Sequence, residues 1–147
     1  MIQIFLIILL SIGTIYNLIK RTEIEYFAEV TIGHYLSIIF LIFILLYLNI
    51  YIFKYNFNNY LVSLTYIIYN FSAILSRGFN RKGIYNMSFL ITRTKFYPWN
   101  IVKALKLNYL RKSGIDVDIV FDVRVFNHRY SDDYEKILLK IKKDLKI

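Results

Sequence analysis

The carboxylates near the end of the chain have the residue type and spacing to suggest metal chemistry. Asp116, Asp118 and Asp122 lie on one face of a predicted strand and carry the oxygen ligands that Ca²⁺ prefers. A calcium-binding loop also needs a glycine turn within the loop and a bidentate glutamate at its end, and this stretch has neither. We therefore interpret these residues as a solvated strand face and predict no metal site and no cofactor.

Other residue types suggest hydrolysis or phosphate binding. His128, Ser131 and Asp132 supply the side chains of a catalytic triad, but they follow one another in a predicted turn without an oxyanion-hole motif. The glycines after basic residues, Gly78 and Gly83, lack the spacing of a phosphate-binding loop. Cysteine is absent, which excludes a thiolate zinc site and a cysteine nucleophile. We predict no catalytic residue and a non-enzymatic protein.

Basic side chains are the remaining candidates for function. Arg77, Arg81, Lys82, Arg93 and Lys95 directly follow the apolar half of the chain. Near an anionic membrane leaflet, each such charge contributes on the order of 1 kcal/mol of attraction. We predict that they contact lipid headgroups or a protein partner, and the alternative is a topology signal alone. Charge by itself also permits nucleic-acid binding, but we expect none for a domain tethered to a membrane.

Composition indicates which elements must position these residues. Of the 147 residues, 57% are hydrophobic and only 20% are charged, against about 45–50% and about 25% in soluble domains. All Lys and Arg except Lys20, Arg21 and Lys54 lie from Arg77 onward, and this last part carries the whole net charge of +9. The pattern excludes a disordered chain and a simple soluble globule. It predicts a membrane-embedded N-terminal half and a small polar C-terminal domain.

Two uncharged stretches, residues 2–19 and 34–53, predict transmembrane helices joined as an antiparallel hairpin over residues 1–54. No basic residue precedes the first stretch and no small-x-small cleavage pattern follows it, which argues against a signal peptide. His34 lies at the edge of the second stretch, and we interpret it as an interfacial residue.

Residues 55–76 are uncharged as well, but they include several asparagines and hydroxyl side chains. Their apolar positions fall on one helical stripe and their polar positions on the other. We favour an amphipathic helix that lies on the membrane or joins the two halves. A third span is the second interpretation, and a pair of β-strands is the third.

The charge distribution also predicts orientation. Because basic residues concentrate after Arg77, the positive-inside rule places residues 77–147 in the cytoplasm. With two spans, the N-terminus is cytoplasmic too, and the loop that contains Lys20 and Arg21 lies outside. With three spans, the N-terminus lies outside.

Residues 77–147 have the pattern of strands followed by a helix. Residues 115–126 alternate between apolar and polar types and predict one half-buried antiparallel strand. Residues 101–110 predict a second strand across a turn at 111–114, and residues 83–86 and 88–97 supply further strand material. Ser131, Asp132 and Asp133 predict the start of a terminal helix. Its apolar stripe should pack on the sheet and consists of Tyr134, Ile137, Leu138, Ile141 and Leu145.

Two short motifs carry a family resemblance. Lys-Gly-Ile-Tyr at residues 82–85, followed by Lys-Phe-Tyr-Pro-Trp-Asn-Ile at residues 95–101, resembles the bacterial pleckstrin-homology-like pattern. The resemblance implies an antiparallel barrel closed by a C-terminal helix, often behind two transmembrane helices, with no shared enzymatic site. Residues 77–147 are short for this barrel, so one or two strands are missing or come from residues 55–76. Trp99, Ile101 and Phe121 are the expected core.

These observations predict a membrane α+β protein with a cytoplasmic pleckstrin-homology-like domain. The leading functional hypothesis is an integral cell-membrane module whose basic domain contacts a protein partner or anionic lipid. The alternative is a small membrane subunit, or an immunity or stress-resistance factor, that acts through helix packing within the bilayer. Ser11 and Gly13 would give the first span a small-residue face for such packing.

Overall fold

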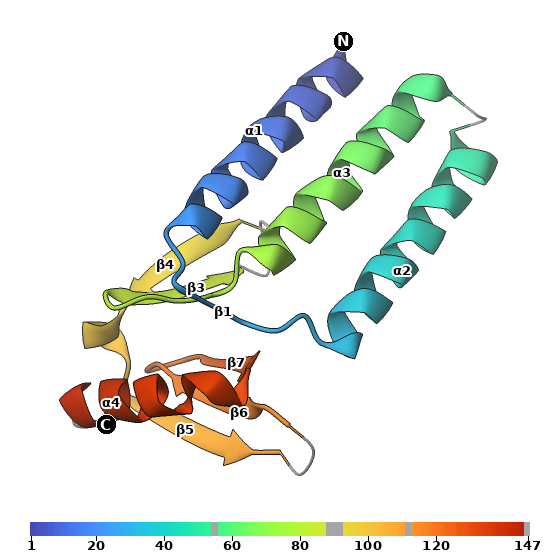
Figure 1. The fold of residues 1–147 in the computed structure, drawn as a ribbon. Coiled ribbons are helices and arrows are strands. Elements are labelled where there is room, and N and C mark those ends of the chain that lie inside the picture. Colours follow the sequence, from blue (N-terminus) through green and yellow to red (C-terminus); the bar gives the residue numbers. More distant parts are fainter. Residues whose placement is uncertain (54–55, 88–92, 111–112, 146–147) are drawn as a thin grey trace.

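Three long helices and a small β domain make up the protein (Figure 1). The computed structural model describes residues 1–53, 56–87, 93–110 and 113–145. Helix α1 covers Ile2–Thr22, and helix α2 covers Ile32–Tyr47 and continues into a π-helical turn at Leu48–Ile52. Helix α3 covers Phe57–Leu75.

Short strands and one more helix form the domain. The strands are β1 (Tyr26–Phe27), β2 (Gly78–Phe79), β3 (Gly83–Met87), β4 (Thr94–Pro98), β5 (Ala104–Tyr109), β6 (Ile115–Val120) and β7 (Val125–Tyr130). Helix α4 covers Glu135–Leu145. Ser131 begins the approach to α4, because its hydroxyl accepts a hydrogen bond from the Asp133 amide.

The three long helices lie side by side, with α3 between α1 and α2 (Figure 1). Helices α1 and α3 run toward the β domain, and α2 runs away from it. The segments Ile2–Thr22 and Ile32–Ile52 are each 21 residues long and apolar enough to cross a membrane, which agrees with the two predicted spans. Met1 and Phe53 lie at the end of the helices away from the domain.

Helix α3 falls in the segment that sequence analysis left open. Its first turn is capped by Asn56, whose side chain accepts a hydrogen bond from the Asn58 amide at 3.0 Å. The segment is therefore helical, as both the amphipathic-helix and the third-span interpretations require, and not a pair of β-strands. It runs alongside α1 for its whole length and does not lie across the ends of the other helices.

The connection between α1 and α2 is part of the β domain. Strand β1 pairs with β2, with Tyr26 opposite Phe79 and Phe27 opposite Gly78. A Cβ atom on Gly78 would collide with the Tyr26 carbonyl and the Ile24 side chain, so the close approach requires glycine. This loop and the domain therefore lie at the same end of the helices, whereas the two-span prediction places them on opposite sides.

The strands form two antiparallel sheets in the described residues, ordered β1-β2-β3-β4 and β5-β6-β7. The single strand predicted at residues 115–126 is wrong, because a tight turn divides it into β6 and β7. The Phe121 amide donates to the Arg124 carbonyl at 2.8 Å across this turn. Val123 is 93% exposed there. No glycine or proline marks the turn, so alternation alone could not show it.

The strand that completes the first sheet comes from Tyr26–Phe27, between α1 and α2, and not from residues 55–76 as the family resemblance suggested. Residues 88–92 of the predicted strand and residues 111–112 of the predicted turn lie outside the described residues. The predicted strand at 101–110 begins later, at Ala104, because Trp99–Ile101 forms a 3₁₀ turn.

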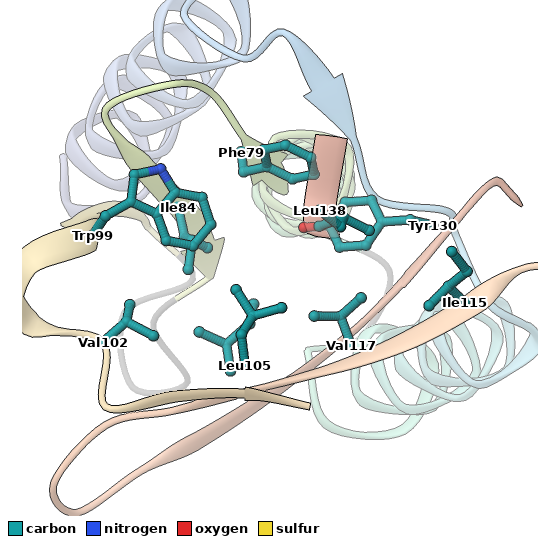
Figure 2. Packing of buried hydrophobic residues seen from close by; sticks show 10 residues of the cluster. Phe79, Ile84, Trp99, Val102, Leu105, Ile115, Val117, Tyr130 and Leu138 are labelled. Carbon is teal, nitrogen blue, oxygen red and sulfur yellow. The ribbon is translucent and has the colours of Figure 1, made fainter. Parts of the chain in front are cut away.

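The domain core lies between the two sheets and α4 (Figure 2). Trp99 belongs to it, and the indole N–H donates to the Asn80 carbonyl at 3.0 Å. Phe121 packs at the core's edge, whereas Ile101 is 43% exposed and is not a core residue. The predicted stripe of α4 is confirmed, with Leu138 buried and the others packed around it. The buried residues of this core are Phe79, Ile84, Trp99, Val102, Leu105, Ile115, Val117, Ile119, Tyr130 and Leu138.

We expect Trp99→Ala to lower the free energy of unfolding of the β domain by about 3–5 kcal/mol, because a buried ring is replaced by a cavity. Membrane association of the helices should persist, since Trp99 lies outside them. Chemical unfolding of the full chain in detergent, followed by limited proteolysis, measures the effect. Ile101→Ala is the matched control and should lower the free energy of unfolding far less. Equal losses in the two variants would show that Trp99 does not stabilise the domain as a core residue.

Candidate functional site

A buried polar cluster joins the helices to the β domain. We call it the polar seam, and it consists of His34, Arg77, Asn86, Asn127, His128 and Tyr130. These residues come from the start of α2, the link between α3 and β2, and strands β3 and β7. Sequence analysis predicted Arg77 as an exposed contact residue, but its residue exposure is only 7%.

Arg77 makes contacts in three directions. Its guanidinium group donates to Nε2 of His34 and, at 3.0 Å, to the Asn127 carbonyl. Its own carbonyl accepts the Ala28 amide at 3.0 Å, which fixes the loop between α1 and α2. Arginine can only donate, so Nε2 of His34 accepts from Arg77, and Nδ1 lies 3.2 Å from the Thr31 amide nitrogen and 2.7 Å from the Thr31 hydroxyl.

The charge of Arg77 is held by neutral acceptors. Burial lowers the pKa of Arg77 from its ordinary value. Because an arginine starts so far above neutrality, it stays charged at physiological pH. The seam therefore carries a fixed positive charge under the helix ends, with Arg77, Asn86, His128 and Tyr130 buried and with His34 partly exposed and Asn127 exposed at its edge.

His128 extends the seam into the domain and is completely buried. Its Nε2 lies 3.0 Å from the Asn86 side-chain oxygen, and its Nδ1 lies 2.8 Å from the Tyr130 hydroxyl. The amide oxygen can only accept, so Nε2 carries the proton and Nδ1 accepts from Tyr130. Burial, with the nearby Arg77 charge, lowers the pKa of His128 well below its ordinary value, and burial raises the pKa of Tyr130.

The three side chains considered for a catalytic triad each bond to other residues. His128 contacts Asn86 and Tyr130, whereas the Asp132 carboxylate accepts the Gly114 amide at 2.9 Å. The Ser131 hydroxyl lies 3.0 Å from Asp133. His128 is thus a neutral packing residue of the domain.

The three candidate metal carboxylates each have a different partner. Asp116 pairs with Arg129 at 2.9 Å, and Asp118 accepts hydrogen bonds from two asparagine side chains. Asp122 lies in the turn, 3.5 Å from Lys103. Among the described residues, no group of three or more metal-binding side chains gathers in one place.

The other predicted contact residues are exposed and lie near the helix ends. Arg81 and Lys82 form the turn between β2 and β3, and Arg93 and Lys95 lie at the start of β4. The Arg93 guanidinium stacks 4.0 Å from the centre of the Tyr16 ring on α1. The structure therefore separates a buried Arg77 from four exposed cations.

A groove of about 490 Å³ opens between the last turn of α1 and the β2–β3 turn, and we call it the α1 groove. Glu23 is fixed in it, because its carboxylate accepts from Lys20 at 2.6 Å and from the Tyr85 hydroxyl at 2.8 Å. These bonds, that of Lys20 first, lower the pKa of Glu23. Burial and the Glu23 bond raise the pKa of Tyr85 to about 12. The lining residues are Lys20, Glu23, Glu25, Asn80, Arg81, Lys82, Tyr85 and Phe96.

Polar side chains between the long helices bond to each other. Among the described residues, side-chain pairs that cross the helix contacts include Gln3–Asn59 at 3.0 Å, Asn17–Ser72 at 3.0 Å and Asn49–Ser63 at 2.7 Å. Gly13 faces the Tyr69 ring so closely that a Cβ atom would lie 2.6 Å from it. At Gly13, the small-residue face that was proposed to pack against a partner's helix therefore packs against α3 of the same chain.

Sequence analysis missed the polar seam and the helix-to-helix pairs. The seam joins residues far apart in the chain, and His128 looked like a turn residue because β6 and β7 were taken as one strand. The asparagines of α3 were visible, but nothing local showed that their partners lie on neighbouring helices.

The fold and site thus define a small α+β protein in which a buried arginine ties two potential membrane helices to a two-sheet domain. Comparisons with models of known protein families, with curated proteins and with solved structures find no significant match to this chain.

We expect Arg77→Gln to lower the free energy of unfolding, because His34 and the Asn127 carbonyl lose a buried donor. Leaving buried polar groups without partners costs about 1–3 kcal/mol. Chemical unfolding measures the loss, and faster amide exchange at Ala28 should report that β1 has loosened. Arg124→Gln, at an exposed position in the same domain, is the control. If the two variants behave alike, Arg77 does not hold the parts together.

Stability should depend on the protonation of His128. Its pKa is depressed in the folded protein and about 6.5 when unfolded, so below pH 6.5 only the unfolded chain takes up this proton. Stability should fall with acidification there, by up to about 1.4 kcal/mol per pH unit, and should gain nothing from this group at higher pH. His128→Gln should flatten the slope between about pH 7 and about pH 5.5. Urea unfolding at several pH values measures it, and parallel slopes would contradict the assignment.

Proposed function

We propose that this protein is a non-enzymatic, membrane-anchored module whose three long helices all cross the bilayer. Its basic β domain lies against the cytoplasmic leaflet and contacts anionic lipid headgroups. The domain is of the bacterial pleckstrin-homology-like kind, for which the two antiparallel sheets and the terminal helix α4 give support beyond the short sequence motifs.

The observation that carries the proposal is the reversed amphipathic pattern of α3. Its apolar stripe is exposed, whereas its polar residues Asn59, Ser63 and Ser72 bond to side chains of α1 or of the π-helical turn after α2. A helix in water buries the apolar face instead. The reversed arrangement suits lipid, where polar groups must find partners inside the protein. The exposed stripe consists of Phe57, Leu61, Leu64, Ile68 and Phe71.

A three-span arrangement also places the basic residues on one side of the membrane. Strand β1 keeps the α1–α2 loop beside the domain, so Lys20 and Arg21 lie on the domain's side. Among the described residues, every Lys and Arg then lies at one end of the helices. The positive-inside rule makes that end cytoplasmic, which places the N-terminus outside. Lys54, between α2 and α3, falls outside the described residues.

The position of the exposed cations supports the proposed lipid contact. Arg93 stacks on Tyr16, one to two turns before the end of α1, so its charge lies at the depth where α1 leaves the apolar region. Lys95 follows on the same strand, and Lys20 belongs to the last turn of α1. Long basic side chains at such a depth extend to the headgroups. The rival function, packing against a partner within the bilayer, loses the support of Gly13 because that residue packs on Tyr69.

Cysteine labelling can test the topology, because the chain has no cysteine of its own. Single substitutions Asn58→Cys, Phe27→Cys and Val123→Cys report on the far end of the helices, the loop and the domain. An impermeant maleimide should label Asn58→Cys in intact cells, and the other two only after permeabilisation. Labelling of Phe27→Cys from outside, with Asn58→Cys protected, would restore the two-span arrangement.

Photo-crosslinking can test lipid contact in the full chain. With a photoactivatable anionic phospholipid in nanodiscs, crosslinks should map to the region of Arg93 and Lys95. Neutralising both as Arg93→Gln with Lys95→Gln should lower the yield several-fold, because each charge contributes on the order of 1 kcal/mol. High salt should lower it as well.

The matched control neutralises Lys103 and Lys106, which are exposed near and on β5, farther from the helices (Figure 1). This pair should leave the crosslinking yield unchanged. If the two pairs of substitutions lower the crosslinking yield equally, or if the yield does not depend on anionic lipid, the basic residues act only as a topology signal.

A further inference from the structure

We propose that the α1 groove binds a phosphoester that also carries a primary ammonium group, the chemistry of an ethanolamine-phosphate headgroup. The inference rests on the proposed function for the depth of the groove in the membrane. Long-range attraction to anionic lipid needs only net positive charge. The groove adds carboxylates and an aromatic wall to its cations, and this mixture selects for a zwitterion.

The backbone that carries the cations of the groove is fixed by hydrogen bonds. Arg81 and Lys82 are consecutive, exposed residues of the β2–β3 turn. The Asn80 side-chain oxygen accepts the amides of Lys82 and Gly83 at 2.8 and 3.1 Å. The Asn80 amide nitrogen donates to the Glu23 carbonyl at 2.9 Å. The turn is therefore ordered before any ligand arrives, which lowers the entropic cost of binding a phosphate.

The two carboxylates of the groove differ in availability. Glu23 is engaged by Lys20 and Tyr85 at hydrogen-bond distance. Glu25 lies 3.8 Å from Arg81, and the two side chains are 45% and 87% exposed. Such an exposed pair is weak and easily exchanged. A phosphate can therefore take Arg81, and Glu25 is then free to receive the ligand's ammonium group.

Aromatic rings complete the ammonium half. Phe96 is 39% exposed in the wall of the groove, and its ring packs against the ring of the buried Tyr85, with the ring centres 5.0 Å apart. Aromatic faces attract cations, and a primary ammonium adds three N–H donors for Glu25. A trimethylated headgroup lacks these donors. A headgroup with only negative charge would leave Glu25 unpaired beside its phosphate.

The position of the α1 groove at the end of α1 makes a membrane lipid one source of this headgroup. Lys20 belongs to the last turn of α1 and also lines the groove. The outer face of α1 above it is apolar and exposed at Ile12, Ile15 and Ile19. Acyl chains along this face would place their headgroup at the groove. Soluble phosphoethanolamine has the same headgroup chemistry without the chains.

The test uses the full chain in nanodiscs of phosphatidylcholine that contain a minor share of either phosphatidylethanolamine or phosphatidylglycerol. Lipid retained on the protein is then measured by native mass spectrometry. We expect several-fold enrichment of the ethanolamine lipid over the choline lipid, whereas retention of the anionic lipid reports the separate contact at Arg93 and Lys95. If soluble phosphoethanolamine displaces the lipid, the headgroup alone is sufficient for binding. If it does not displace the lipid while the lipid is still retained, the ligand is the lipid. Both outcomes support binding in the groove.

Variants separate the two halves of the groove. Glu25→Gln should abolish the preference for ethanolamine over choline lipid, and Arg81→Gln with Lys82→Gln should lower retention of both. Glu29→Gln, an exposed carboxylate in the same loop, is the control and should change nothing. Unaltered thermal unfolding would show that the variants fold.

Equal retention of ethanolamine and choline lipid by the unmodified chain would overturn the proposal, as would equal effects of Glu25→Gln and Glu29→Gln. Crosslinking at Arg93 and Lys95 does not depend on the groove. If crosslinking persists while ethanolamine selectivity is absent, the headgroup site fails and the proposed function stands. If crosslinking and topology both fail, the proposed function itself is wrong.

Discussion

A buried arginine constrains how the two halves of this protein meet. Arg77 has left α3 and not yet entered β2, and a cation at this place needs acceptors on every side. It finds them on α2, in His34, and on β7, in the Asn127 carbonyl, while its own carbonyl binds the returning loop at Ala28. Moving α2 or β7 would take away one of the two acceptors of this buried charge. The helices and the domain are therefore a single mechanical unit.

The helices show a second constraint, the need to satisfy polar side chains away from water. Asn17, Asn49 and Gln3 each bond to a polar residue of α3. Asn17 also accepts the Thr94 amide at 3.0 Å, so one side chain connects α1, α3 and the start of β4. In an apolar environment such bonds fix the neighbours of each helix. They explain why the most polar of the three helices lies in the middle.

Local patterns predicted the elements better than their assembly. Apolar length was enough for α1 and α2, and helical periodicity was enough for α3 and for the face of α4 that covers Leu138. Periodicity could not show which face of α3 meets protein, because the answer depends on the surrounding solvent. It also missed the two-residue strand β1, which is too short to have a pattern. The position of Arg77 was visible, but its burial depends on partners more than forty residues away.

The pairing of Tyr26 with Phe79 has a consequence for biosynthesis. Strand β1 leaves the ribosome before α2 and α3 exist, and its partner β2 is made only after both. The first sheet therefore cannot close until every long helix has been synthesised and has turned back to the same end. A long sequence separation of this kind slows folding. A chain with a misplaced helix would therefore leave β2 without its edge strand and Phe79 without the Tyr26 ring that stacks on it.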